Sequence, residues 1–272
     1  MMRHRIVTYG GLLMASALLA TVAGAPAASA NPTTPMPATE KLVVVSGDEV
    51  MIRTPRPGGG LIINLYRAPE QSSGLQMLAR LKAKGLVPAG VTTQVEADPM
   101  ECTTIYAQAK YLCLKTVPHY WFNWRWNGFS DPQIYFRDHT PAAWPVRASV
   151  TEWNRAVGVD SYWTTGACPT GGRHCVHVWN ADYGDDWVGH TYMEVDSIGF
   201  FIDGLVWVEL NDRFSSAEDN RSTACHELGH ALGLAHNGSV SSCMYWQAIA
   251  GPDPRLPLQT DYQVLTNILY RD

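Results

Sequence analysis

The chain has 272 residues, of which 46% are hydrophobic and 17% are charged, and its formal net charge is −5. This length holds one large domain or two of ordinary size, and the composition excludes a disordered polyelectrolyte. The acidic balance excludes the strongly basic surface of a dedicated nucleic-acid-binding protein, so we expect no nucleic-acid partner.

The first thirty residues have the pattern of a secretory signal peptide. Arg3 and Arg5 precede an apolar run over residues 6–25, and Ala28-Ser29-Ala30 supplies the small residues of a cleavage site. The alternative is an N-terminal membrane anchor, but a Tyr-Gly-Gly sequence at residues 9–11 leaves the run short for a span. We therefore predict a secreted, extracellular protein. No other run approaches spanning length, so we expect no membrane association after signal removal.

The rest of the chain divides near residue 116. All ten tryptophans lie at or beyond Trp121. Residues 31–116 carry nine basic and seven acidic side chains, a net charge of 9 − 7 = +2, whereas residues 117–272 carry nine basic and eighteen acidic ones, 9 − 18 = −9. The predicted organisation is therefore a signal peptide over 1–30, an N-terminal extension over 31–116 and a compact domain over 117–272.

The N-terminal extension has few elements and no catalytic motif. Strand-like runs over residues 41–45 and 61–66 flank a glycine-rich turn at residues 58–60. Leucines spaced three apart predict a helix over residues 75–84, which Gly85 is placed to end.

The compact domain alternates strands and helices. A helix from Val146 to Val157 is predicted by apolar residues at i, i+4, i+7 and i+11, with Gly158 after its end. Asp203-Gly204 predicts a type I′ hairpin turn. The other predicted elements are strands over 133–136, 162–165, 176–179, 198–202 and 205–210 and helices over 219–232 and 260–270. This order predicts an α+β fold, a mixed twisted sheet covered by helices.

Residues 222–236, Ser-Thr-Ala-Cys-His-Glu-Leu-Gly-His-Ala-Leu-Gly-Leu-Ala-His, contain the most specific motif. His226 and His230 are four apart, so on a helix they project from one face, as two imidazole ligands of one metal ion must. Gly233 can end the helix and turn the chain back, which brings His236 to the same ion. Three imidazoles leave one position open, as in a catalytic zinc site, and Glu227 can take a proton from a water that the metal activates. The alternative is an amphipathic helix with surface histidines, which requires a chance occurrence of roughly a few in a hundred thousand.

The pattern HExxHxxGxxH resembles the zinc signature of the metzincin metalloproteases, and the wider chain resembles their matrixin branch. Residues 144–153 resemble its first long helix, which backs the sheet. Residues 205–211 resemble the strand before the zinc helix, Ser242-Cys-Met-Tyr245 resembles the Met-turn, and residues 261–270 resemble the closing helix. The resemblance covers residues 117–272. It implies one catalytic zinc ion bound by His226, His230 and His236, with Glu227 as general base and Met244 beneath the metal. Taken alone, Met244 also suits an ordinary core position.

The chain departs from the matrixin pattern in several places. The cysteine-switch motif of matrixin pro-segments is absent, and residues 99–103 do not match it. The loop that holds structural zinc and calcium is not recognisable, although His174, His177 and His190 lie in that region. A trio of acids there, Asp182, Asp185 and Asp186, could bind calcium, whereas acids in a loop are more often just solvated. Trp246 stands where the family has proline, which puts the specificity pocket in doubt.

We expect a secreted, monomeric zinc endopeptidase that cleaves protein or peptide substrates. A substrate strand would pair with an exposed sheet edge near residues 189–202. The opposite net charges favour residues 31–116 as the pro-segment of a zymogen over an independent binding domain. Two other functions remain open, namely a catalytically silent zinc-binding or adhesion module and a metallohydrolase acting on a non-peptide bond. The retained Glu227 argues against the first, and the Met-turn argues against the second.

Six cysteines in an exported chain predict disulfides. The expected local pairs are Cys102–Cys113, Cys168–Cys175 and Cys225–Cys243. The third pair follows from the resemblance, because a Met-turn lying under the zinc brings Cys243 near the zinc helix. The competing hypothesis is that Cys102 stays free and caps the zinc as a thiolate.

Overall fold

The computed structural model describes residues 41–95, 108–113, 121–216, 219–247 and 256–271. The predicted signal peptide and Cys102 lie outside the described residues. Within these ranges, no helix has both the length and the apolar character needed to cross a membrane.

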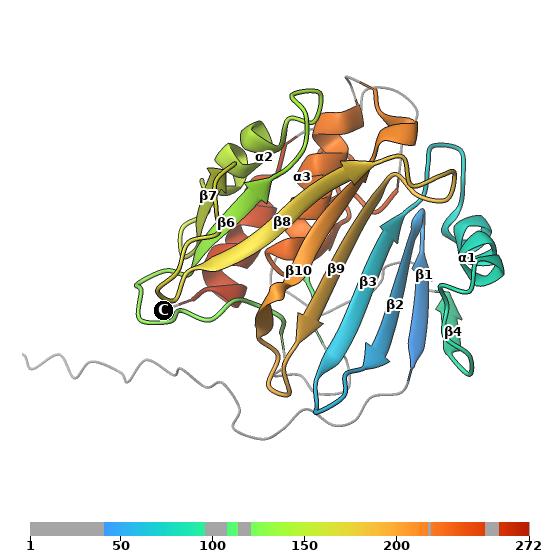
Figure 1. Ribbon diagram of the computed structural model, residues 1–272, viewed down its shortest axis with the longest axis horizontal. Coiled ribbons are helices and arrows are strands. Elements are labelled where there is room, and N and C mark those ends of the chain that lie inside the picture. The colour runs from blue at the N-terminus through green and yellow to red at the C-terminus, as the bar shows by residue number, and fades with distance from the viewer. Residues whose placement is uncertain (1–40, 96–107, 114–120, 217–218, 248–255, 272) are drawn as a thin grey trace, which may run out of the picture.

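A nine-stranded mixed sheet organises the molecule, in the order β4-β1-β2-β3-β9-β10-β8-β6-β7 (Figure 1). The C-terminal half of the sheet contains β6 (Gln133–Asp138), β7 (Asp160–Thr164), β8 (His174–Ala181), β9 (Gly189–Val195) and β10 (Phe201–Asn211). Within this half, β9 alone runs antiparallel to its neighbour β10, and the other pairs are parallel. The predicted α+β class with a mixed sheet is confirmed.

Strands of the N-terminal part extend the same sheet. β1 (Leu42–Ser46), β2 (Glu49–Pro55) and β3 (Leu61–Arg67) form an antiparallel meander, and β4 (Thr92–Val95) pairs parallel to β1. β3 then pairs antiparallel with β9 along its whole length, from Leu61 opposite Val195 to Arg67 opposite Gly189. The expectation of an exposed edge near residues 189–202 is therefore wrong, because β3 satisfies the backbone groups that an edge strand would leave unpaired.

Helices cover both faces of the sheet. On one face, three helices close the main core, namely α2 (Val146–Trp153), α3 (Asp219–Ala231) and α4 (Gln259–Val264). The last of these continues as a π-helical segment over Leu265–Leu269. On the other face α1 (Gly74–Ala83) packs Met77, Leu78 and Leu81 against Val43 and Val45 in a second, smaller core. Alternation along β1 explains this, because Val44 points into the main core instead.

The remaining elements are short. A 3₁₀ turn spans Asp212–Phe214, and a two-stranded sheet joins β5 (Ala109–Tyr111) to β11 (Leu234–Asn237). This small sheet ties the chain just after the zinc-motif helix to a segment far earlier in the sequence.

Two local predictions need correction. The helix predicted to reach Val157 ends at Trp153, and Val157 is 72% exposed. The side chain of Asn154 accepts a hydrogen bond from the amide of Ser161 at 2.8 Å, which directs the chain into β7 instead of another helical turn.

Asp203-Gly204 does not form the predicted hairpin turn. It lies inside β10, where the pairing register with β9 shifts between Phe201 and Val206. The reversal occurs earlier, because the carboxylate of Asp196 accepts hydrogen bonds from the amides of Ile198 and Phe200. Gly204, with φ of +78°, then fits the irregularity in the strand.

The turn between β2 and β3 offers a test of the β3–β9 pairing. Gly58 and Gly60 both have positive φ, but a Cβ on Gly60 would overlap the Val195 carbonyl of β9, whereas one on Gly58 meets nothing within 4 Å. We expect Gly58→Ala to lower the free energy of unfolding by about 1 kcal/mol and Gly60→Ala by about 3 kcal/mol. Urea denaturation of the two variants measures the difference, and equal losses would contradict the pairing.

Candidate functional site

The zinc-motif residues lie on α3 and on the strand that follows it. His226, Glu227 and His230 lie on α3, and all three side chains are buried. The helix ends at Ala231, and Gly233, with φ of +100°, turns the chain into β11, which carries His236. A Cβ on Gly233 would also overlap the carbonyl of Phe122, so both backbone conformation and space require glycine there.

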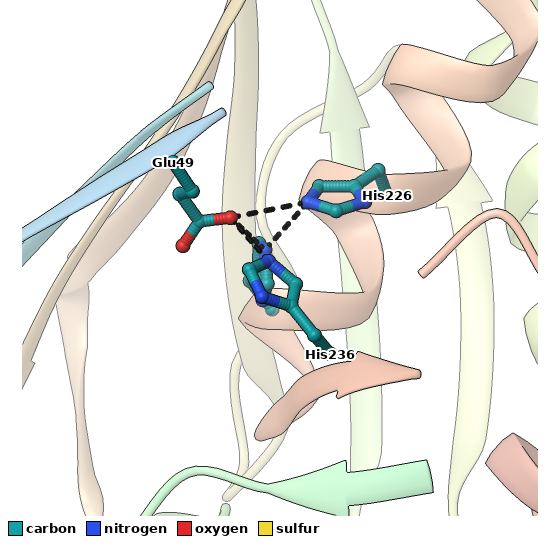
Figure 2. A group of neighbouring side chains, drawn as sticks. Glu49, His226 and His236 are labelled. Atoms are coloured by element: carbon teal, nitrogen blue, oxygen red, sulfur yellow. Dashed lines mark hydrogen bonds and ion pairs between the residues drawn. The ribbon is translucent and has the colours of Figure 1, made fainter. Parts of the chain in front are cut away.

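The turn at Gly233 brings the three imidazoles together. The Nε2 atoms of His226 and His230 lie 2.9 Å apart. The His236 ring centroid is 5.3 Å from each of the other two ring centroids. Figure 2 shows that a fourth side chain, Glu49 of β2, points into the same space. The facing donor atoms of these four residues all lie within 4.8 Å of one another, and all four residues are buried.

The hydrogen bonds of the outer ring nitrogens fix how two of the histidines face the centre. Nδ1–H of His226 donates to the carbonyl of Cys243, and Nδ1–H of His230 donates to the carbonyl of Leu234, each at 2.8 Å. When these rings are neutral, both Nε2 atoms present lone pairs inward. Two lone pairs 2.9 Å apart repel each other unless a cation lies between them. A set of imidazole nitrogens with a carboxylate oxygen fits zinc, so these residues suit that ion.

Glu227 lies beside this cluster, not in it. Its Oε2 accepts a hydrogen bond from the Thr191 hydroxyl of β9 at 2.6 Å, and its Oε1 has no hydrogen-bond partner within the described residues. Burial raises the pKa of the Glu227 carboxyl to about 7, against the opposing influence of His230 and Thr191. A carboxyl group with this pKa can take up and release a proton near neutral pH.

Met244 is fully buried beneath the motif helix. A Cβ on Gly229 would overlap the Met244 sulfur, so the methionine packs directly against the helix backbone beside His230. The Met244 amide donates to Ser242 Oγ at 2.9 Å, and Ser242 Oγ in turn donates to Asp261 Oδ2 at 2.7 Å. The C-terminal helix thereby holds the turn under the site.

Two of the three expected disulfides lie within the described residues and are present. Cys225–Cys243 joins the helix to the turn that carries Met244, and Cys168–Cys175 closes a short loop. Cys113 is also disulfide-bonded, while its expected partner Cys102 lies outside the described residues. The hypothesis of a free Cys102 thiolate on zinc likewise concerns a residue outside them.

Glu49 is the residue that sequence reasoning missed. Its Oε2 lies 3.3 Å from Nε2 of both His226 and His230 and makes a shorter contact with Nε2 of His236. Burial opposes ionisation, but His236 and His230 outweigh it and hold the pKa of Glu49 well below its usual range. Glu49 is 177 residues from His226 along the chain and belongs to no motif, so no sequence signal identifies it.

The other histidines and acids considered as metal ligands lie elsewhere with separate partners. His174 hydrogen-bonds Asp203 and the Arg125 carbonyl, His190 hydrogen-bonds Glu209, and His177 hydrogen-bonds His139. His177 also lies near Cys168 and Cys175, whose sulfurs are joined in a disulfide and offer no thiolate.

The three loop acids form ion pairs with basic side chains. Asp182 and Asp185 contact Arg213, and Asp186 contacts Arg80 and Lys84. These partners leave the calcium hypothesis without support.

Comparison with known families gives one result. The matrixin family model matches residues 159–271, a range that includes the motif helix, β11 and the Met244 turn. A search of curated proteins gives no match to the chain. The family implies zinc as the metal, and the mixed sheet with its helices agrees with a matrixin-like catalytic fold.

The Cys225–Cys243 disulfide positions the carbonyl that orients His226, which gives a test of the site. Replacing both cysteines by serine should lower the free energy of unfolding by about 3 kcal/mol. The same variant should weaken zinc binding about tenfold, because the Cys243 carbonyl loses its fixed position. The matched control is the double serine variant of Cys168 and Cys175, which should cost about 2 kcal/mol and leave zinc affinity unchanged. Chelator competition measures the affinities, and equal affinity in all three proteins would contradict this role.

Proposed function

Because the matrixin family model matches residues 159–271, we propose that the protein is a matrixin-like, secreted zinc-dependent endopeptidase. The observation that carries the proposal is the convergence of His226, His230 and His236 on one buried point beside Glu227. In this proposal the three imidazole Nε2 atoms hold the zinc ion. Two of the rings are already oriented for this by carbonyl acceptors on their outer nitrogens.

When bound there, zinc supplies Lewis acidity toward the scissile carbonyl and the attacking water. The protein's own part is proton transfer. Glu227 accepts a proton at its carboxylate and passes it to the leaving amine. The Thr191 hydroxyl holds Oε2 of Glu227, and the unpartnered Oε1 is the atom free to exchange a proton.

Residues 1–30 act as a signal peptide, residues 31–116 as a pro-segment and residues 117–272 as the catalytic domain of a monomer that acts on protein substrates. The two described disulfides support an extracellular setting, because disulfides persist in oxidising compartments.

Replacing the proposed base separates catalysis from metal binding. Glu227→Ala should retain zinc, because three histidines remain, and should lower peptide hydrolysis by about 10²- to 10⁴-fold. His230→Ala should lose both zinc and activity. The measurements are zinc content and cleavage of a quenched peptide, with and without chelator, by protein recovered from the medium before and after proteolytic removal of the N-terminal segment.

The outcomes distinguish the competing functions. Near-normal proteolysis by Glu227→Ala would reject Glu227 as the base. Zinc binding by a wild type that cleaves no peptide even after proteolytic removal of the N-terminal segment would favour a silent binding module. Cleavage only of non-peptide substrates would favour another metallohydrolase.

Export should remove the first thirty residues. Because Ala28 and Ala30 occupy the small-residue positions of the cleavage site, the exported form that has undergone no later cleavage should begin at Asn31. N-terminal sequencing checks this. A form that retains Met1 and fractionates with membranes would restore the anchor hypothesis.

A further inference from the structure

Glu49 occupies the centre of the histidine cluster. Its side chain is about 2% exposed, and its Oε2 contacts Nε2 of all three histidines. Its second oxygen, Oε1, is buried and has no hydrogen-bond partner within the described residues. A buried carboxylate whose nearest neighbours are three metal-ligating nitrogens has the position of a fourth ligand.

The backbone around Glu49 is held in place on both sides. Glu49 begins β2 directly after the two-residue turn at residues 47–48. The carbonyl of Gly47 accepts from the Gly74 amide at 2.8 Å, and the carbonyl of Asp48 accepts from the Ala68 amide at 2.7 Å. The buried Asp48 carboxylate also lies 3.5 Å from Nε of Arg67, the residue paired with Glu49 in the β2–β3 ladder. These contacts fix the turn and thereby the position of the Glu49 backbone beside the histidines.

Trp246 connects this turn to the Met244 segment. A Cβ on Gly47 would overlap both the ring and the carbonyl of Trp246, so the indole lies directly against the glycine. Trp246 stands where matrixins have proline after the Met-Tyr pair. In this chain that departure provides a contact surface for the turn that carries Glu49.

The same N-terminal segment, here residues 41–95, also fills the sheet edge beside the site. β3 pairs with all seven residues of β9. Its Ile63 and Leu65 pack in the main core with Met193 and Val195, while Tyr66 packs in the second core with Trp187. An extended peptide that binds by strand addition needs an unpaired edge, and β9 offers none while β3 is in place.

We propose that the N-terminal segment keeps the protein latent by a carboxylate switch, with Glu49 as the fourth zinc ligand and β3 in the place of the substrate strand. This inference rests on the proposed function. A zinc ion with three histidines and one carboxylate has no open position, which is the arrangement of closed sites and not of catalytic ones. The segment thus replaces the cysteine motif that is absent from this chain, and activity requires that Glu49 and β3 leave together.

Access of a small zinc ligand to the metal tests the switch without any activity assay. The intact exported chain is loaded with Co²⁺, and its visible absorption spectrum is recorded while acetohydroxamate is added. We expect no spectral change in the wild type at millimolar acetohydroxamate, because Glu49 fills the fourth position. A saturable change in the intact wild type would overturn the proposal, whatever the variants do.

Glu49→Gln removes the ligand charge at nearly constant shape. We expect the variant to bind zinc at least tenfold more weakly in chelator competition and to give a saturable acetohydroxamate response. The matched control is Glu70→Gln, the same substitution at an exposed position of the same segment, which should behave as the wild type. Circular dichroism establishes that both variants are folded. If Glu49→Gln folds and matches the control in zinc affinity and in closure to acetohydroxamate, Glu49 is not a ligand.

The result also separates this proposal from the proposed function. If the wild type binds no zinc, or if His230→Ala binds zinc as tightly as the wild type, the histidine site itself is wrong. If zinc binding depends on His230 but acetohydroxamate reaches the metal equally in wild type and Glu49→Gln, only the switch is wrong.

Discussion

Three buried imidazole rings crowded against one another set the central physical constraint of this protein. The Nε2 atoms of His226 and His230 face each other at 2.9 Å, an arrangement that neutral rings tolerate only around a cation. The surrounding fold serves this arrangement. Gly233 turns His236 inward, the Leu234 and Cys243 carbonyls orient the outer nitrogens, and the Cys225–Cys243 disulfide ties the second of these carbonyls to the helix.

The N-terminal segment is part of the same architecture and not a separate module. Its strands continue the central sheet, and residues such as Ile63 and Leu65 share a core with β9. Moving the segment away would expose apolar surface on both faces of β3 and leave the β9 edge unpaired. In the proposed latent state, strand pairing and the shared core hold the segment beside the site, so its release requires that several strands separate together.

Two departures from the matrixin pattern have a common structural explanation. The chain lacks the cysteine motif, and it has Trp246 where the family has proline. In the structure Trp246 lies against Gly47, two residues before Glu49. The residue that replaces the family's proline therefore contacts the turn that carries Glu49, the residue proposed to act in place of the cysteine motif. The charge difference between the two halves of the sequence gives no hint of this contact, because the residue at the centre is an acid from the more basic half.

The sequence by itself determined what depends on local spacing. The i, i+4 histidines, the glycine that ends the helix, the apolar runs of β1 and β3 and the leucine spacing of α1 all act within a few residues, so they can be read along the chain. Local patterns failed where a neighbour competed, as when Asn154 ended α2 early and Asp196 turned the chain before Asp203-Gly204. Only the tertiary structure decided that β3 covers β9 and that Glu49 meets the histidines. Those contacts join residues more than a hundred positions apart. The periodicity of a strand shows which of its faces is buried but does not identify the strand with which it pairs.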